Sequence, residues 1–91
     1  MKEVLAAMHR ANIRRARFHC HVDAINERGA IGAVDITGPV GDPIPHGWIN
    51  PGEWNGPLPQ KGQVFDVLAD IRQYFKGSGI EDFGLFHVRV L

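Results

Sequence analysis

The sequence predicts an α+β fold, a two-layer sandwich in which a small three-stranded sheet carries both helices on one face. Three observations lead to this fold class. Two segments repeat apolar residues at helical spacing, three segments alternate apolar and polar residues, and a stretch rich in proline and glycine lies between them. The predicted order is α-β-β-loop-α-β within a single domain, residues 1–91.

The first predicted helix covers residues 2–15. Val4, Leu5, Met8 and Ala11 fall on one stripe of such a helix. Glu3 suits its first turn, and the arginines that follow suit its C-terminal end, where the helix dipole favours positive charge. The segment is therefore expected to be a short amphipathic helix that covers the sheet.

Two strands are predicted next, over residues 16–25 and 30–37, and they are expected to form a β-hairpin. Phe18, Cys20 and Val22 point to one face because successive side chains of a strand alternate. The segment "NERG" between the strands has asparagine at its start and glycine at its end, as turns often do.

Residues 38–62 are predicted to form a long ordered loop, since they hold all six prolines, and both tryptophans lie among them. Disorder is not expected, because it would leave the tryptophans and other apolar side chains in water. We expect Trp48 to pack inward and Trp54 to be presented outward, where tryptophan serves well as an anchor for a partner.

The second helix is predicted over residues 63–79, where apolar residues recur at spacings of three and four, and a last strand over 84–91. On this helix Asp66 and Asp70 would lie one turn apart on the solvated side. The expected core is Val4, Leu5, Met8, Phe18, Cys20, Val22, Val34, Ile36, Val64, Val67, Leu68, Ile71, Phe75, Phe86, Val88 and Val90.

The face of the sheet away from the helices is expected to be polar. It would show Arg17, His19, His21, Asp23, Ile31, Asp35, His87 and Arg89. His19, His21 and His87 are candidate ligands of a divalent metal ion, because imidazole is a common zinc ligand. The alternative is an ordinary solvated face, since a His-x-His motif is short and common.

No arrangement typical of an enzyme is found, and neither a catalytic residue nor a cofactor is expected. The one serine, Ser78, lies in a flexible "GSG" segment without a nucleophile motif. Cys20 would face away from His19 and His21 on its strand, so these histidines cannot activate it as a nucleophile. A single cysteine also excludes an internal disulfide, which fits a cytoplasmic location.

The leading hypothesis is a non-enzymatic module that binds an unidentified protein partner through the loop at 43–59 and the polar sheet face. The candidate contact residues are His46, Trp48, Ile49, Glu53, Trp54 and Leu58. Pairing of two copies through an edge strand is plausible. A membrane partner is not expected, because no segment approaches the length of about 20 apolar residues that a span needs.

The alternative hypothesis is nucleic-acid binding through the basic N-terminal segment, with Arg10, Arg14, Arg15 and Arg17 as contacts. Residues 1–21 carry five basic and one acidic side chain, a net charge of +4, and residues 22–91 carry −4. The chain as a whole is neutral, so it has no general attraction for polyanions. Any such binding must therefore depend on how the charges are distributed.

Overall fold

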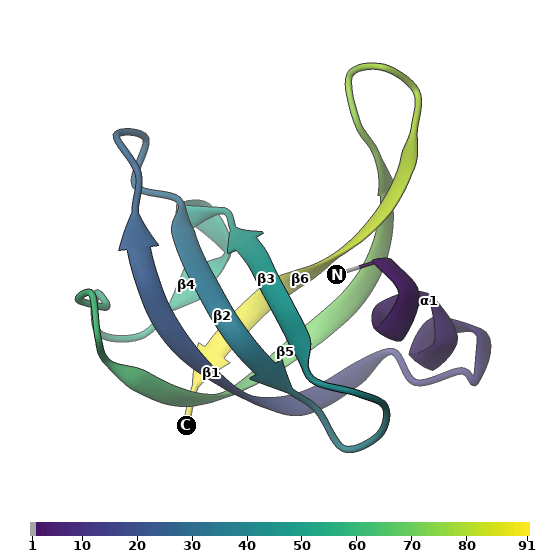
Figure 1. The fold of residues 1–91 in the computed structure, drawn as a ribbon, viewed down its shortest axis with the longest axis horizontal. Helices are drawn as coiled ribbons and strands as arrows, with labels where there is room; N and C mark the ends of the chain where they lie inside the picture. The colour runs from purple at the N-terminus through teal and green to yellow at the C-terminus, as the bar shows by residue number, and fades with distance from the viewer. Residues whose placement is uncertain (1) are drawn as a thin grey trace.

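The computed structural model describes residues 2–91, which form one helix and one six-stranded mixed sheet (Figure 1). The elements are α1 (Lys2–Arg10), β1 (Arg15–Ile25), β2 (Ile31–Thr37), β3 (Ile44–Ile49), the 3-10 turn η1 (Pro51–Glu53), β4 (Trp54–Asn55), β5 (Val64–Phe75) and β6 (Glu81–Val90). The predicted sandwich of two helices on three strands is therefore wrong. The predictions of the N-terminal helix, the β-hairpin and the last strand are confirmed.

β5 occupies most of the segment predicted as the second helix. Val67, Ala69 and Ile71 are buried in alternation, as one face of a strand requires. β5 pairs antiparallel with β1 on one side and with β6 on the other, so its backbone groups are satisfied by neighbouring strands. Apolar residues spaced by three and four also fit a helix, but valine, isoleucine and phenylalanine favour strands when partners exist.

The predicted loop at 38–62 contains two strands. β3 pairs antiparallel with β2, and its position at an edge of the sheet tolerates Pro45. Asn50 then caps η1, where its side-chain Oδ1 accepts a hydrogen bond of 2.9 Å from the backbone N–H of Gly52. β4 follows directly and pairs in parallel with β6.

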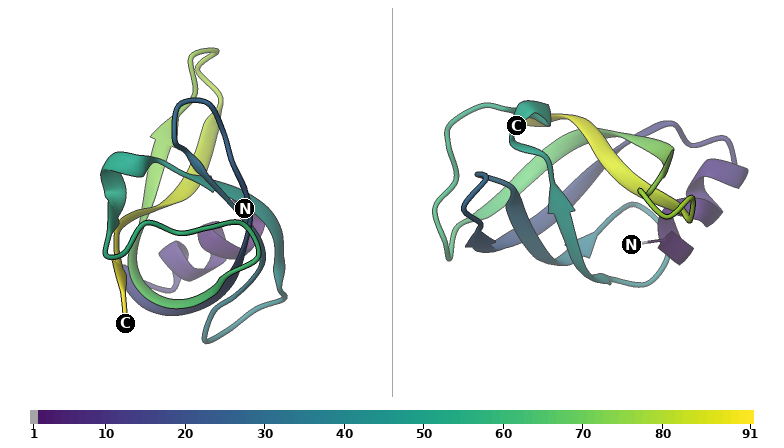
Figure 2. Two further views of the ribbon diagram at one scale, coloured as in Figure 1. Left: turned by 90° about the vertical axis from the view of Figure 1, so that its left-hand side faces the viewer. Right: turned by 90° about the horizontal axis from the view of Figure 1, so that it is seen from above.

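The sheet is strongly curled because the chain joins its two edges. The strand order is β3-β2-β1-β5-β6-β4, so β3 and β4 lie at opposite edges, although only residues 50–53 separate them. The edges must therefore approach each other, and the strands wrap around the core as a partly open barrel (Figure 2). α1 packs against β5 and β6 at one end of this barrel. No helix within residues 2–91 is long and apolar enough to cross a membrane.

The core fills the inside of the barrel. Its buried residues are Leu5, Ala6, Met8, Ala16, Phe18, Cys20, Val22, Ile31, Ala33, Ile36, Ile44, Ile49, Trp54, Val67, Ala69, Ile71, Phe83, Leu85 and Val88. Nine of the predicted core residues are in this set: Leu5, Met8, Phe18, Cys20, Val22, Ile36, Val67, Ile71 and Val88. Val4 and Val90 pack against it, whereas Val34, Leu68 and Phe86 are half-buried.

Three placements differ from the predictions. Val64 and Phe75 were expected in the core but are exposed, because they lie at the two ends of β5. Ile31 was expected on the polar face but is buried, because β2 begins with its side chain directed into the barrel.

The exposures of the two tryptophans are the reverse of those predicted. Trp54 is only 7% exposed, whereas Trp48 is 48% exposed. The Trp54 ring packs edge-to-face on Phe65, with ring centroids 5.2 Å apart, and its Nε1–H donates a 2.9 Å hydrogen bond to the carbonyl of Pro57. A buried indole needs such an acceptor. Trp54 therefore belongs to the core, and Trp48 is the tryptophan that faces solvent.

Candidate functional site

A cleft of about 340 Å³ opens between the end of the β1–β2 hairpin, β3 and the β5–β6 hairpin. Its lining residues are Ala30, Trp48, Asn50, Tyr74, Gly84, Leu85 and Phe86. These residues come from four separate segments of the chain, and the curl of the sheet brings them together. We refer to this hollow as the aromatic cleft, because three of its walls are aromatic side chains.

Glycines on the sheet make room for the aromatic rings. A Cβ atom at Gly32, which pairs with Trp48 across β2 and β3, would lie only 3.0 Å from the indole ring. A Cβ atom at Gly84 would lie 3.2 Å from the Tyr74 ring and 3.3 Å from the Phe86 ring. The rings can therefore lie close against the backbone. The Tyr74 and Phe86 rings pack edge-to-face, with their centroids 6.0 Å apart.

Charged groups border the cleft on the side of β5. The Arg72 guanidinium lies 5.9 Å from the centre of the Phe86 ring, within the range of a cation–π contact. The Tyr74 hydroxyl donates to Asp82 Oδ2 at 3.2 Å, and Lys76 pairs with the same oxygen at 3.2 Å. Burial and the adjacent Asp82 carboxylate raise the pKa of Tyr74, so this side chain remains a neutral phenol at neutral pH.

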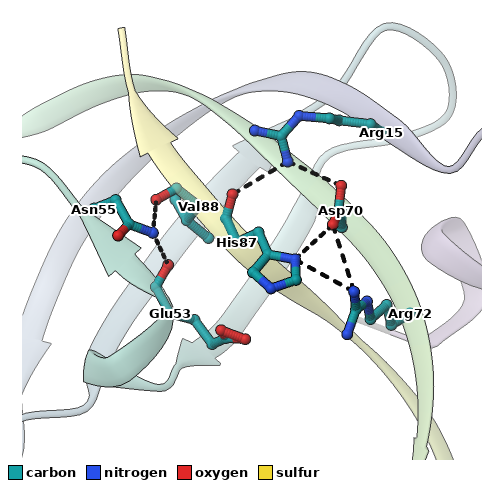
Figure 3. Close-up of polar contacts among 7 residues, drawn as sticks. All are labelled: Arg15, Glu53, Asn55, Asp70, Arg72, His87 and Val88. Carbon is teal, nitrogen blue, oxygen red and sulfur yellow. Dashed lines mark hydrogen bonds and ion pairs between the residues drawn. The ribbon is translucent and has the colours of Figure 1, made fainter.

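Asp70 lies beside the cleft at the centre of a cluster of cationic side chains (Figure 3). One carboxylate oxygen accepts a 2.9 Å bond from Arg15, and the other lies 2.7 Å from His87 Nδ1 and 3.8 Å from Arg72. Arg15 also donates to the backbone carbonyl of His87 at 3.2 Å. The bonds from His87 and Arg15 lower the pKa of Asp70 despite its partial burial.

A bulge in β6 turns His87 toward this cluster. His87 has a φ of 48°, a left-handed conformation that is uncommon outside glycine. The pairing of β5 with β6 shifts between Leu68 and Asp70, which lies opposite this bulge. Bulges change the direction of side chains in this way. The alternation in the sequence gives no sign of this extra residue.

Asp66 repeats the arrangement four residues earlier on β5. It lies opposite His19 in the register with β1, with 3.1 Å between Asp66 Oδ1 and His19 Nδ1. Arg17 lies 3.5 Å from the other carboxylate oxygen. The hydrogen bond with His19, followed by the charge of Arg17, lowers the pKa of Asp66.

These groups form one surface on the outside of the sheet, which we call the arginine face. It consists of Arg15, Arg17, His19, His21, Asp66, Asp70, Arg72, His87 and Arg89. Asp23 of β1 and Asp35 of β2 lie on the same side of the sheet, so four arginines and four aspartates share this side, a net charge of zero without the histidines. The positive charge is local to Asp70, where the two guanidinium groups of Arg15 and Arg72 face one carboxylate beside the aromatic cleft.

The three histidines suggested as metal ligands are only partly brought together. His19 and His21 are neighbours, with ring centroids 5.9 Å apart, but His87 pairs with Asp70 on the far side of β5. Among residues 2–91, no group of three histidine, cysteine, aspartate or glutamate side chains could hold a metal ion. Cys20 is buried, and burial together with Asp66 raises the pKa of its thiol to about 11.

The residues suggested as contacts for a protein partner do not form one surface. Ile49 and Trp54 are core residues, and Leu58 lies in the segment that follows β4, outside the aromatic cleft. Trp48 and His46 remain together on the exposed side of β3, with ring centroids 5.3 Å apart. The exposed tryptophan that the sequence predicts at position 54 is thus Trp48.

Of the four arginines suggested as nucleic-acid contacts, only Arg15 and Arg17 lie on the arginine face. Arg14 instead donates to the carbonyl of His9 at the end of α1, and Arg10 is the last residue of that helix. Sequence reasoning missed Arg72 and Tyr74 as site residues because it placed β5 in a helix, and it missed Phe86 because the alternation of the last strand assigned that side chain to the core. Read as a strand, residues 66, 70, 72 and 74 share one face.

The chain matches no family model, and neither a curated protein nor a solved structure shows significant similarity to it.

The aspartate clusters predict a loss of stability in acid. Asp66 and Asp70 each have a lower pKa in the folded state than in the unfolded state, where the pKa is about 3.9. Their charged forms stabilise the fold at pH values above 3.9, and this stabilisation is lost as the pH falls through the pKa of the folded state. We expect Asp70→Asn to destabilise the protein most near pH 6 and least near pH 3. Urea unfolding of both proteins at several pH values measures this difference, and a constant difference across that range would contradict the assignment.

Proposed function

We propose that this protein binds single-stranded nucleic acid. Unpaired bases would stack in the aromatic cleft, and phosphates would lie along the arginine face. The observation that carries the proposal is Trp48, which is half exposed in a cleft with Tyr74 and Phe86, next to Arg72. Proteins that bind single strands combine such stacking surfaces with positive charge that follows the backbone.

The two surfaces adjoin, which supports a common ligand. Arg72 contacts the Phe86 ring in the cleft and also lies 3.8 Å from Asp70 in the arginine face. A strand with one base in the cleft would therefore have its neighbouring phosphates within reach of Arg72 and Arg15. The exposed faces of bases are available in single strands but not within a duplex.

The connectivity offers a further, weaker argument by analogy. If β3, η1 and β4 are counted as one interrupted strand, the chain is a five-stranded, partly open Greek-key barrel, as in OB-folds. OB-folds bind oligonucleotides and oligosaccharides on strands 2 and 3 and on the loops that join strands 1 to 2 and 4 to 5. The aromatic cleft lies among the corresponding elements.

The proposal predicts that Trp48→Ala weakens binding to single strands by about 5- to 150-fold, since stacking on one aromatic side chain contributes about 1–3 kcal/mol per base. The measurement is fluorescence anisotropy with labelled 12-nucleotide oligomers of deoxythymidine and of uridine, at 50 mM salt. Leu58→Ala is the matched control, because Leu58 is 86% exposed and lies outside the cleft. It should leave the affinity unchanged.

A duplex of the same length and a neutral oligosaccharide complete the experiment. Preference for single strands over both supports the proposal. Equal affinity for the duplex would point to charge alone, and binding of the sugar would assign the cleft to carbohydrate. If no nucleic acid binds at 50 mM salt, the proposal is wrong, and the protein-partner hypothesis, with Trp48 and His46 as its anchors, takes its place.

A further inference from the structure

The arginine face contains the same arrangement of side chains twice. In each copy, an aspartate of β5 holds an arginine of β1 and a histidine by separate carboxylate oxygens: Asp70 holds Arg15 and His87, and Asp66 holds Arg17 and His19. Arg72 adds a second guanidinium to the Asp70 copy. Both copies are solvent-accessible, so an external anion can compete with the aspartates.

We infer that these two clusters are phosphate subsites. Arg15 and Arg72 form one subsite, in which Asp70 competes with the ligand for the arginines. Arg17 and His19 form the other, in which Asp66 competes with the ligand for Arg17. This inference rests on the proposed function. The chemistry is that of a guanidinium, which binds phosphate and carboxylate oxygens through the same N–H groups. An arginine bonded to its aspartate is therefore less available to a phosphate.

The two subsites lie in line along β5, so two non-adjacent phosphates of one strand could occupy them. Asp66 and Asp70 lie on the same face of β5, four residues apart, which corresponds to about 13 Å at the rise of a strand. The Asp70 subsite is the one that adjoins the aromatic cleft through Arg72. A bound strand would therefore run from the cleft over Arg72 and Arg15 toward Arg17.

Each histidine is the second partner of its aspartate. A ring nitrogen lies 2.7 Å (His87) or 3.1 Å (His19) from the carboxylate oxygen that the arginine of β1 does not contact. Each of these arginines therefore contacts only one oxygen of its aspartate, which leaves further N–H groups of the guanidinium for a phosphate.

The surroundings of both histidines are consistent with this role. His87 faces Asp70 and Arg72 on β5 and Arg15 on β1, with Arg89 two residues further along its own strand. His19 faces Asp66 on β5.

On β1, Arg17, His21 and Asp23 lie at alternate positions on the same side as His19. On β2, Asp35 and Thr37 lie nearby, with Thr37 paired to His19 in register. Each histidine thus has one aspartate as its direct carboxylate partner.

The test is removal of the competing charge. Asp70→Asn and Asp66→Asn should each tighten binding of the 12-nucleotide oligomers by about threefold or more at 50 mM salt. Each newly formed phosphate contact should also steepen the dependence of log K on log salt by about 0.7. Asp42→Asn is the matched control, because it changes the total charge equally at an exposed position in the β2–β3 connection, outside the arginine face. It should alter the affinity less than twofold.

The inference is wrong if Asp66→Asn and Asp70→Asn bind no more tightly than wild type, or if Asp42→Asn tightens binding equally. Such results would leave the proposed function standing, provided that Trp48→Ala still weakens binding. If neither wild type nor the aspartate variants bind, the proposed function itself fails.

Discussion

Replacing Trp54 by alanine is expected to destabilise the protein by about 3–5 kcal/mol, the range for removal of a buried aromatic side chain. The change would open a cavity beneath Phe65 and leave the carbonyl of Pro57 without its indole donor. In a domain of this size the melting temperature should fall by more than about 10 °C. Thermal unfolding followed by circular dichroism measures the effect.

Trp48→Ala is the matched comparison, because it removes the same side chain from an exposed position. Its melting temperature should stay within a few degrees of wild type, since surface substitutions usually change stability little. The two variants thus separate a core residue from an exposed one: Trp54→Ala reports on stability, and Trp48→Ala reports on the proposed binding of single strands. If Trp48→Ala were the more destabilising of the two, the placement of both tryptophans would be wrong.

Gly56→Ala is expected to destabilise the protein by about 2–6 kcal/mol, because two costs add. Gly56 has a φ of 143°, a conformation that costs other residues about 1–3 kcal/mol. A Cβ atom there would lie 2.7 Å from Val90 Cγ2 and 2.8 Å from Val90 Cβ, and such overpacking costs about 1–3 kcal/mol. Urea unfolding gives the free energy.

Substitutions at two other glycines allow the backbone strain and the steric overlap to be measured separately. Gly62 has a φ of 92° but open space around it, so Gly62→Ala should show the backbone strain alone. Gly77 has neither a positive φ nor a neighbour within 4 Å, so its replacement should be neutral or slightly stabilising. Equal effects of Gly56→Ala and Gly62→Ala would show that the approach of β4 to β6 is not tightly packed.

That approach is also held by polar bonds. The Asn55 side-chain amide donates to the carbonyls of Glu53 and Val88, at 3.2 and 3.3 Å (Figure 3). Together with the parallel pairing of β4 and β6, these bonds fix the short segment that joins the two edges of the sheet.

Sequence reasoning succeeded where a local pattern had one physical interpretation. Strict alternation from Arg15 to Ile25 and the "NERG" turn identify the first hairpin, because no helix has that period. The apolar stripe of Leu5 and Met8 likewise identifies α1. In these segments, local preference and tertiary structure agree.

It failed where tertiary pairing decided between two local options. From Val64 to Phe75, apolar residues fit both a helix and a strand, and pairing with β1 and β6 selects the strand. Prolines suggested a loop between residues 38 and 62, but an edge strand tolerates Pro45. The aromatic cleft could not be predicted, since it combines four segments that meet only when the sheet curls.

The position of β6 in the chain has a consequence for the order of folding. β4 pairs only with β6, and Trp54 lies opposite Val88 in that pairing. During synthesis from the N-terminus, the first hairpin and β3 can form early, but the strand that pairs with β4 is missing until residues 81–90 have emerged. Pairing between distant segments is slow and leaves apolar surface exposed in the meantime. Barrel closure should therefore be the last step of folding, and Trp54 fluorescence the signal that follows it.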